Sequence, residues 1–368
     1  MGLSIHQPIH PLMRPRLDPQ YLAFHEKHFQ HLPTIESQAW DPACRNAAAA
    51  STLGRAGCVE VGSVRDVVVE SEMGCGNGGC IEMRVFTPRG DAPGEGWPVL
   101  GIAVSDLMIT VYGTGGWVVG GLDSENAFLT LVCRDVKCVV ISLNYRHAPE
   151  HPYPAAVDDV VYGLSWIARY GNRELGVDTT RIVLGGLSAG GGLATILVMK
   201  ASLLTPPIPI IGQLLILPVI DNTAGTSLST TTTSSSLTTS ESNSNPNPSD
   251  PWLLNQHAPF LTPQRMLWYR SHYLPNPTHA TSWTASPNFA PSALLAACPR
   301  TVIAVGECDL LAEEARRYGE LLRREGVACE VMEYRGATHS TLILAGALDI
   351  GKQMVGDMVE SLKEMFAM

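Results

Sequence analysis

The sequence predicts an α/β fold in which helices flank a mostly parallel central sheet. Short apolar runs with strand character alternate along the 368-residue chain with longer helical patterns. Strands and helices that alternate at this spacing form parallel sheets with crossover connections. Hydrophobic residues make up 45 % of the chain, which is enough to bury a large core. We therefore expect a single α/β domain over residues 1–368.

Seven short apolar runs are typical of strands. They lie at residues 64–70, 81–86, 138–143, 181–185, 213–218, 301–306 and 329–332. Longer patterns that are typical of helices lie at residues 21–26, 155–170, 191–200, 313–325 and 345–366. The alternation of the two kinds favours helices on the faces of the sheet.

Residues 223–250 are a low-complexity segment. Ser and Thr dominate it, and Asn-Pro repeats lie near its end. Such a segment cannot bury enough apolar surface to order itself, so we expect a disordered surface insertion. It precedes an aromatic-rich helical region at residues 252–273.

The composition excludes several classes of partner. A formal net charge of -10 argues against nucleic acid and anionic membrane, because both require clustered Lys and Arg. No apolar run approaches the length of a membrane span. The first residues lack the basic and apolar blocks of a signal peptide, so we expect a cytoplasmic protein. Cys75 and Cys80 flank a Gly-rich turn and could bridge, but reduced thiols are the expectation for such a chain.

Ser188 is the candidate nucleophile. It is the centre of a G-x-S-x-G pattern at residues 186–190, between the predicted strand at 181–185 and the predicted helix at 191–200. A Ser on so tight a turn from strand to helix is typical of a nucleophile elbow. The turn lifts Oγ clear of the sheet, and the helix N-terminus favours negative charge beside it. The pattern alone also occurs by chance, so the prediction depends on its strand-turn-helix context.

His339 and Asp309 are the candidate partners of Ser188. In hydrolases with this elbow the chain order is Ser, acid, His, and His339 follows the last plausible acid-bearing strand. Asp309 comes just after a predicted strand, with Glu307 and Glu313 as alternative acids. The competing interpretation makes Asp309 a helix cap and His339 a polar loop residue. The required order, with each residue after a strand, favours a catalytic triad.

These motifs resemble those of the hormone-sensitive-lipase branch of the α/β-hydrolases, from about residue 60 to the end. The branch pattern G-D-S-A-G-G-N-L-A is matched at residues 186–194, except at Leu187 and Gly192. The branch marker Y-R-L-A-P-E-x-P-x-P-A corresponds to residues 145–155, and the acid motif D-P-L-x-D-E to residues 309–314. The resemblance implies that the first acid of this last motif belongs to the triad.

The resemblance also implies an α/β-hydrolase fold with a helical cap. The cap would be built from residues 1–55 and 251–285. More narrowly, the chain is similar to fungal esterases of polyketide pathways, such as versiconal hemiacetal acetate esterase. That likeness implies acetate esters of a secondary-metabolite intermediate as substrates.

The oxyanion loop departs from the branch, which carries H-G-G-G-W there. The resemblance implies an oxyanion hole made of three backbone N–H groups, those of Gly115, Gly116 and Ala189. The His that anchors the loop is replaced by Gly113, and the first glycine is replaced by Thr114. If that position needs a positive φ, Thr costs on the order of 1–3 kcal/mol. The preceding run at 100–111 is longer than the usual strand, as an error in the gene model would produce.

We therefore expect a carboxylic ester hydrolase that acts on small or medium acyl esters with no cofactor and no metal. Its partner would be a small-molecule ester, and the oligomeric state stays open. The altered oxyanion loop leaves a second interpretation, a non-catalytic small-molecule-binding protein on a hydrolase scaffold. A third interpretation is a structural or interaction protein, and only the Ser/Thr-rich insertion supports it.

Overall fold

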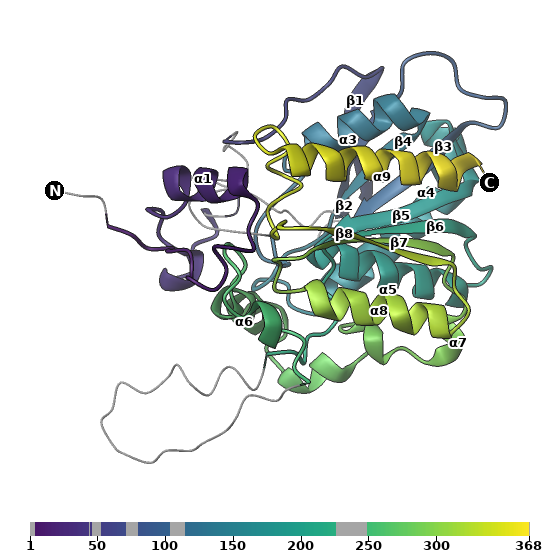
Figure 1. Ribbon diagram of the computed structural model, residues 1–368. Coiled ribbons are helices and arrows are strands. Elements are labelled where there is room, and N and C mark those ends of the chain that lie inside the picture. Colours follow the sequence, from purple (N-terminus) through teal and green to yellow (C-terminus); the bar gives the residue numbers. More distant parts are fainter. Residues whose placement is uncertain are drawn as a thin grey trace.

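One eight-stranded sheet organises the molecule. The computed structural model describes residues 4–43, 45, 53–70, 80–103, 115–225 and 249–367. Within these residues the strand order across the sheet is β1-β2-β4-β3-β5-β6-β7-β8 (Figure 1). The strands are β1 (Ser63–Glu70), β2 (Cys80–Thr87), β3 (Trp97–Ala103), β4 (Val139–Asn144), β5 (Val177–Leu187), β6 (Ile210–Ile216), β7 (Arg300–Gly306) and β8 (Cys329–Tyr334). The β1–β2 and β2–β4 pairs are antiparallel and the other pairs are parallel, which confirms the predicted fold class.

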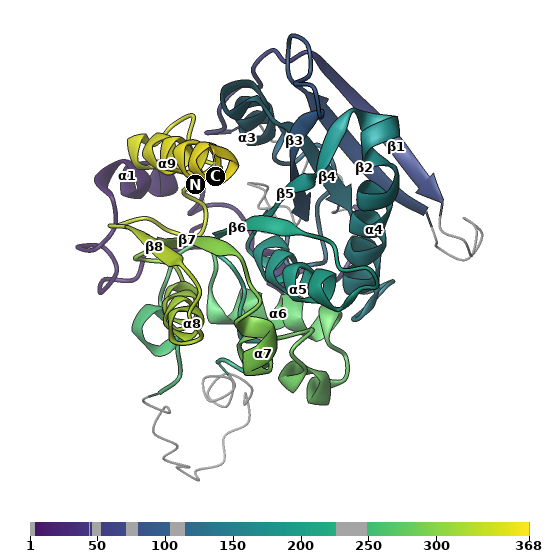
Figure 2. The same ribbon diagram turned by 90° about the vertical axis from the view of Figure 1, so that its right-hand side faces the viewer.

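Helices cover both faces of the sheet (Figure 2). One face carries α3 (Asn126–Val132) and α9 (Asp349–Ala367), and the other carries α4 (Ala155–Leu175), α5 (Ala189–Leu203) and α8 (Ala312–Arg324). Helix α5 is apolar all round and buried, whereas α8 is strongly amphipathic. The shorter elements are α1 (Pro19–His28), η1 (Ile35–Ser37), η3 (Cys133–Lys137), η5 (Leu253–Asn255), α6 (Pro263–Tyr273), η6 (Pro277–Thr281), η7 (Pro287–Phe289) and α7 (Ser292–Leu295).

All seven predicted strands are present, and β3 is added between β5 and β4. Every residue of β3 is buried, so its sequence shows no alternation of polar and apolar residues. The strand ends at Ala103, and most of the unusually long run at 100–111 lies outside the described residues. Helix α3 was not predicted either, because seven residues are too few for a clear helical period.

The two segments predicted to form a cap pack against each other. In Figure 1, α1 and α6 lie at the same end of the sheet. Arg265 of α6 is buried and donates to Glu36 Oε2 of the N-terminal segment at 2.9 Å and to Gln7 Oε1 at 3.1 Å. The rings of Phe29 and Phe260 lie 5.9 Å apart, centroid to centroid. Whether the pair acts as a cap over the site stays a prediction.

The two ends of the predicted insertion belong to the ordered fold, while residues 226–248 lie outside the described residues. The N–H of Gly225 donates to both carboxylate oxygens of Asp250, each at 3.1 Å. Gly225 has φ +74°, and a Cβ there would overlap the ring of Trp252. Trp252 in turn donates its indole N–H to Glu314 Oε2 at 2.9 Å. The described residues on the two sides of 226–248 are therefore in direct contact.

The cysteines depart from the expectation at one position. Cys80 is disulfide-bonded, so the expectation of reduced thiols is wrong there. Among the described residues, the free cysteines are Cys58, Cys133, Cys138, Cys298, Cys308 and Cys329. Burial raises the pKa of Cys133 and of Cys298 to about 12, so neither thiol is ionised near neutral pH.

Candidate active site

The predicted site residues all follow strands of the parallel part of the sheet. Ser188 comes directly after β5, Asp309 after β7, His339 after β8, and Gly115 after β3. Because these strands are parallel, their carboxyl ends meet at one edge, which is where open α/β sheets bind their ligands.

Ser188 sits on a strained turn between β5 and α5. Its φ of 56° and ψ of −120° lie in a region that costs a residue with a side chain about 1–3 kcal/mol. The neighbouring β6 loop holds it there, since its N–H donates to Ile216 O at 2.9 Å and its C=O accepts from Val219 N–H at 3.0 Å. A Cβ at Gly186 would overlap the carbonyl of Gly190, which explains the first glycine of the pattern.

Ser188, His339 and Asp309 form one hydrogen-bonded chain. His339 Nε2 lies 2.9 Å from Ser188 Oγ, and His339 Nδ1 lies 2.7 Å from Asp309 Oδ2. A carboxylate can only accept, so Nδ1 carries the proton and Nε2 is free to take the one from Ser188. All three side chains are buried, with 3 % of Ser188, 1 % of Asp309 and none of His339 exposed. The low dielectric constant of this buried environment strengthens both hydrogen bonds.

The acid loop is fixed by groups on both sides of Asp309. Asp309 Oδ1 accepts from Leu311 N–H at 3.1 Å within the turn before α8. The N-cap of α8 is Leu311, so Asp309 is not the helix cap of the competing interpretation. The amide of Asn255 donates to the carbonyls of Glu307 at 2.9 Å and of Asp309 at 2.7 Å. Each carboxylate oxygen of Asp309 therefore has its own partner, Leu311 N–H or His339, and these contacts fix the orientation of the carboxylate toward His339.

The two alternative acids are engaged elsewhere. Glu307 Oε2 accepts the N–H of Gly336 at 2.9 Å, which ties the acid loop to the loop that carries His339. Glu313 lies on α8 and pairs with Arg317 at 2.9 Å. Neither carboxylate contacts His339, so the geometry favours Asp309.

The oxyanion segment is described from Gly115 onward, and Gly113 and Thr114 lie outside the described residues. Gly116 has φ +45°, and the Tyr269 ring fills the space that a Cβ would take. Within the described residues no acceptor takes the N–H of Gly115 or Gly116. The N–H of Ala189, the first residue of α5, has no partner inside its helix. These three free donors fit an oxyanion hole, a role that stays a prediction.

An aromatic stack secures the other end of this segment. The ring of Trp117 lies flat on the ring of Tyr273 at 4.2 Å, and its C=O accepts from Ala148 N–H at 2.9 Å. Ala148 belongs to the branch marker at 145–155, in which Arg146 makes an ion pair with the buried Asp159 at 2.7 Å. The marker therefore holds Trp117, which directly follows the predicted oxyanion residues.

Two supporting residues were not predicted as part of the site. Asn255 has no sequence signal, because it reaches the acid loop only through tertiary structure. Glu314 ends the acid motif at 309–314 and could have been singled out there. Its buried carboxylate accepts from Ile220 N–H at 2.8 Å, and burial, with the nearby Asp221, raises its pKa to about 8.

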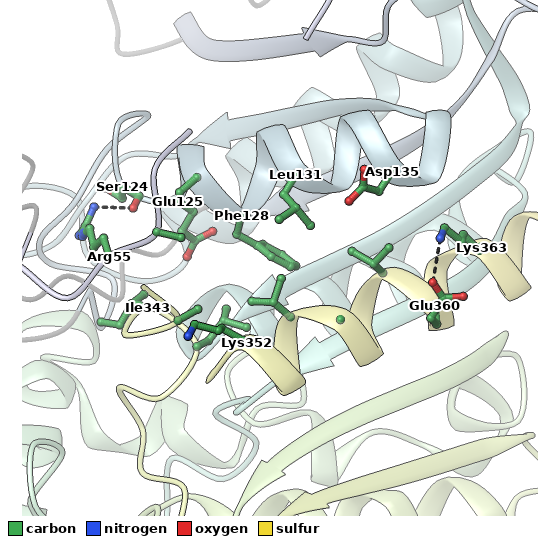
Figure 3. Close-up of a pocket in the computed structure, with 17 residues that line it drawn as sticks. Arg55, Ser124, Glu125, Phe128, Leu131, Asp135, Ile343, Lys352, Glu360 and Lys363 are labelled. Atoms are coloured by element: carbon green, nitrogen blue, oxygen red, sulfur yellow. Dashed lines mark hydrogen bonds and ion pairs between the residues drawn. The ribbon is translucent and has the colours of Figure 1, made fainter. Parts of the chain in front are cut away.

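A separate groove of about 350 Å³ lies between α3 and α9 (Figure 3). Phe128 and Leu131 of α3 face α9 across it, and Ile343 of the loop after His339 closes one end. None of the six predicted site residues lines this groove. It is therefore distinct from the triad.

Comparison with known proteins places this arrangement in a family. A family described by the alpha/beta hydrolase fold matches residues 109–343. The chain belongs to the α/β-hydrolase family. It is 32 % identical over 365 residues, 98 % of its length, to an AB hydrolase superfamily protein of Schizosaccharomyces pombe, and covers 97 % of that protein. It is 30 % identical over 269 residues to the carboxylic ester hydrolase LipN of Mycobacterium tuberculosis, which covers 72 % of this chain and 64 % of LipN.

The fold is shared with solved hydrolases. An α/β-hydrolase enzyme from the metagenome of Lake Arreo superimposes with a TM-score of 0.76 at 22 % identity, over 96 % of this chain and all of that one. The resemblance to the hormone-sensitive-lipase branch is thus confirmed, and the similarity to carboxylic ester hydrolases supports the expected serine carboxylesterase. The narrower likeness to polyketide-pathway esterases stays a prediction. Among the described helices, none combines the length and the apolar character that crossing a membrane would take.

Proposed function

We propose that the protein hydrolyses carboxylic esters with small or medium acyl groups by means of Ser188, His339 and Asp309. The observation that carries the proposal is the buried chain of two hydrogen bonds, of 2.7 and 2.9 Å, that joins the three side chains. Its geometry meets the requirements of an activated nucleophile, a base within reach of it, and a third group that orients the base.

In the proposed reaction Ser188 Oγ forms a bond to the ester carbonyl carbon while His339 Nε2 takes the Oγ proton. The carbonyl oxygen becomes an oxyanion, which the N–H groups of Gly115, Gly116 and Ala189 stabilise. The ester C–O bond then breaks, and His339 gives its proton to the leaving alcohol. Water cleaves the acyl-Ser188 bond by the same steps, and releases the acid. Asp309 stabilises the imidazolium in both halves.

Aromatic side chains beside the oxyanion segment support the limit on acyl size. The Tyr269 ring packs on Gly116, and the Trp117–Tyr273 stack adjoins it. In this proposal the rigid rings favour small or medium acyl groups over long ones. Acetate esters, including those of a secondary-metabolite intermediate, fit this class. The alternative of a non-catalytic binding protein has less support, because ligand binding alone does not require an aligned Ser-His-Asp chain.

Ser188→Ala is expected to abolish hydrolysis of p-nitrophenyl acetate and labelling by a fluorophosphonate probe, with the melting temperature nearly unchanged. The variant removes the nucleophile but hardly changes the packing of the core, because the side chain loses only one oxygen atom. Ser202→Ala, on the same helix, is the matched control and should keep both activities. Unchanged turnover in the Ser188 variant would rule out the proposed mechanism.

A further inference from the structure

The loop that carries His339 rests on the N-terminal helix α1. Residues 338–341 are Thr-His-Ser-Thr, and all four side chains are fully buried. Asp18 caps α1 by accepting from Tyr21 N–H at 3.0 Å, and its own N–H donates to Gly336 O at 3.1 Å. A Cβ at Gly336 would overlap the backbone of Asp18. The first turn of α1 is therefore in direct contact with the segment just before His339.

Two buried side chains of α1 continue this contact. Tyr21 is fully buried, and the hydroxyls of Ser340 and Thr338 interact with its phenol group and partly offset the rise of its pKa on burial. The same Tyr21 hydroxyl lies 3.3 Å from His25 Nδ1. His25 Nε2 lies 2.7 Å from the carbonyl oxygen of Gln7. A chain of polar groups thus runs from Gln7 to the two residues that flank His339.

The direction of each hydrogen bond in this chain is fixed by chemistry. A carbonyl can only accept, so Nε2 of His25 carries the proton and Nδ1 of the neutral ring is an acceptor. Burial, as the largest cause, lowers the pKa of His25, which keeps the ring neutral. Tyr21 must therefore donate its one hydroxyl proton to His25. Its oxygen is left to accept the hydroxyl proton of Ser340, whose own oxygen can accept from Thr338.

The two hydroxyls beside His339 are linked as well. Thr338 Oγ1 lies 3.1 Å from Ser340 Oγ, and Thr338 N–H donates to Thr341 Oγ1 at 2.8 Å. The hydroxyls of Thr338, Ser340 and Thr341 therefore each have a buried partner within the loop. In a buried network the loss of one partner leaves several others unpaired.

We propose that Tyr21 and His25 are positioning residues for His339, which act through Thr338 and Ser340. The inference rests on the proposed function, because His339 must hold Nε2 at hydrogen-bond distance from Ser188 Oγ and Nδ1 at the same distance from Asp309. A shift of about 1 Å in such a group can cost on the order of 10²-fold in rate. The N-terminal segment is in this way part of the catalytic apparatus.

The test compares Tyr21→Phe with Tyr318→Phe. Tyr318 is an equally buried tyrosine whose hydroxyl lies 2.8 Å from Thr195 Oγ1, in a part of the core that does not contact the His339 loop. Both variants lose one buried hydroxyl and its hydrogen bond. Tyr21→Phe should lower kcat on p-nitrophenyl acetate, and the rate of fluorophosphonate labelling, by roughly 10-fold or more, with KM within about twofold. Tyr318→Phe should leave both rates near those of the native protein.

Substitutions of His25 give a second comparison that does not depend on Tyr21→Phe folding well. His25→Gln keeps one donor and one acceptor and should retain most of the rate, whereas His25→Leu should lose about as much as Tyr21→Phe. Equal losses of kcat in the Tyr21 and Tyr318 variants, or in the two His25 variants, would overturn the inference. An unmodified protein that neither turns over the ester nor reacts with the probe would instead overturn the proposed function.

Discussion

Asp309 uses its two carboxylate oxygens for different tasks, which one substitution can separate. One oxygen accepts from Leu311 N–H and the other from His339 Nδ1–H. Asp309→Asn can keep the hydrogen bond from Leu311 N–H through its amide oxygen, but its amide nitrogen then faces Nδ1. The ring is forced into the wrong tautomer, with the proton on Nε2.

Asp309→Asn should therefore lower kcat by about 10⁴-fold, as in other triads of this kind, with little change in stability. Glu313→Gln is the control, because Glu313 lies on α8 and, within the described part of the chain, pairs with Arg316 and Arg317. It should keep kcat within about twofold. Steady-state kinetics on one short-chain ester measure both. A larger loss from Glu313→Gln would reassign the acid.

Gly116 offers a test of the oxyanion segment. Gly116→Ala places a side chain at φ +45° and against the Tyr269 ring, so the segment must shift and its N–H groups turn away from the oxyanion. The loss of one such donor typically lowers kcat by about 10²–10³-fold. Gly121→Ala is the matched control in the same stretch, since nothing lies within 4 Å of its added Cβ. Similar kcat values for the two variants would argue against the assigned hole.

The three triad candidates were predictable because their chain order and their places after strands follow from the sequence alone. The residues that hold them were not. Tyr21 and Asn255 reach the site from segments far away in the chain, and only the folded molecule brings them to His339 and Asp309. Nothing in the local pattern distinguishes Tyr21 from a residue that merely packs.

At the scale of elements, the insertion could also be recognised from its local sequence, whereas its exact ends depend on tertiary contacts. Its composition marks it plainly, but its boundaries depend on contacts. Gly225 and Asp250 are joined by hydrogen bonds, and Trp252 packs on Gly225. The strands were predicted well where apolar runs are bounded by turns. Strand β3 was missed because every residue in it is buried, so polar and apolar residues do not alternate. Helix α3 was missed because seven residues are too few to show a helical period.

Replacement of residues 226–248 by a short Gly-Ser linker should change the melting temperature by no more than a few degrees. The ends already meet, and the entropy of loop closure grows only slowly with length. Gly225→Ala should lower the melting temperature clearly, because φ +74° and the Trp252 ring both disfavour a Cβ. Thermal denaturation of the two variants and of the native protein measures these differences in melting temperature. A large drop on replacement alone would show that the segment itself stabilises the fold.

At the scale of the whole molecule, the buried His147 contributes its own pH dependence to the stability, besides that of His25. The branch pattern has Leu at the position of His147, yet here burial, with Arg45 nearby, lowers the pKa of His147 to about 3. The folded protein keeps this ring neutral, while the unfolded chain binds a proton below about pH 6.5. The unfolded state thus binds more protons between these values, so stability is lost as pH falls from about 6.5 toward 3.

His147→Leu should remove this dependence. At pH 7 the variant should equal or exceed the native protein, since Nε2 of His147 has no hydrogen-bond partner within the described structure. At pH 5 the variant should gain a further 2 kcal/mol or so in the free energy of unfolding. His151→Leu, at the exposed neighbouring position, is the control. Urea titrations at the two pH values give the difference, and parallel behaviour of all three proteins would contradict the assignment.

The contact between the two sides of 226–248 also marks a division of the chain into two functional halves. Residues up to Gly225 contain β1 to β6 and Ser188, and residues from Asp250 contain β7, β8, Asp309 and His339. Expressed as separate polypeptides, neither half holds a complete triad. The parallel pairing of β6 with β7 and the Gly225–Asp250 hydrogen bonds would join them again. Such a pair would be a complementation reporter, in which ester turnover signals that two fused proteins have met.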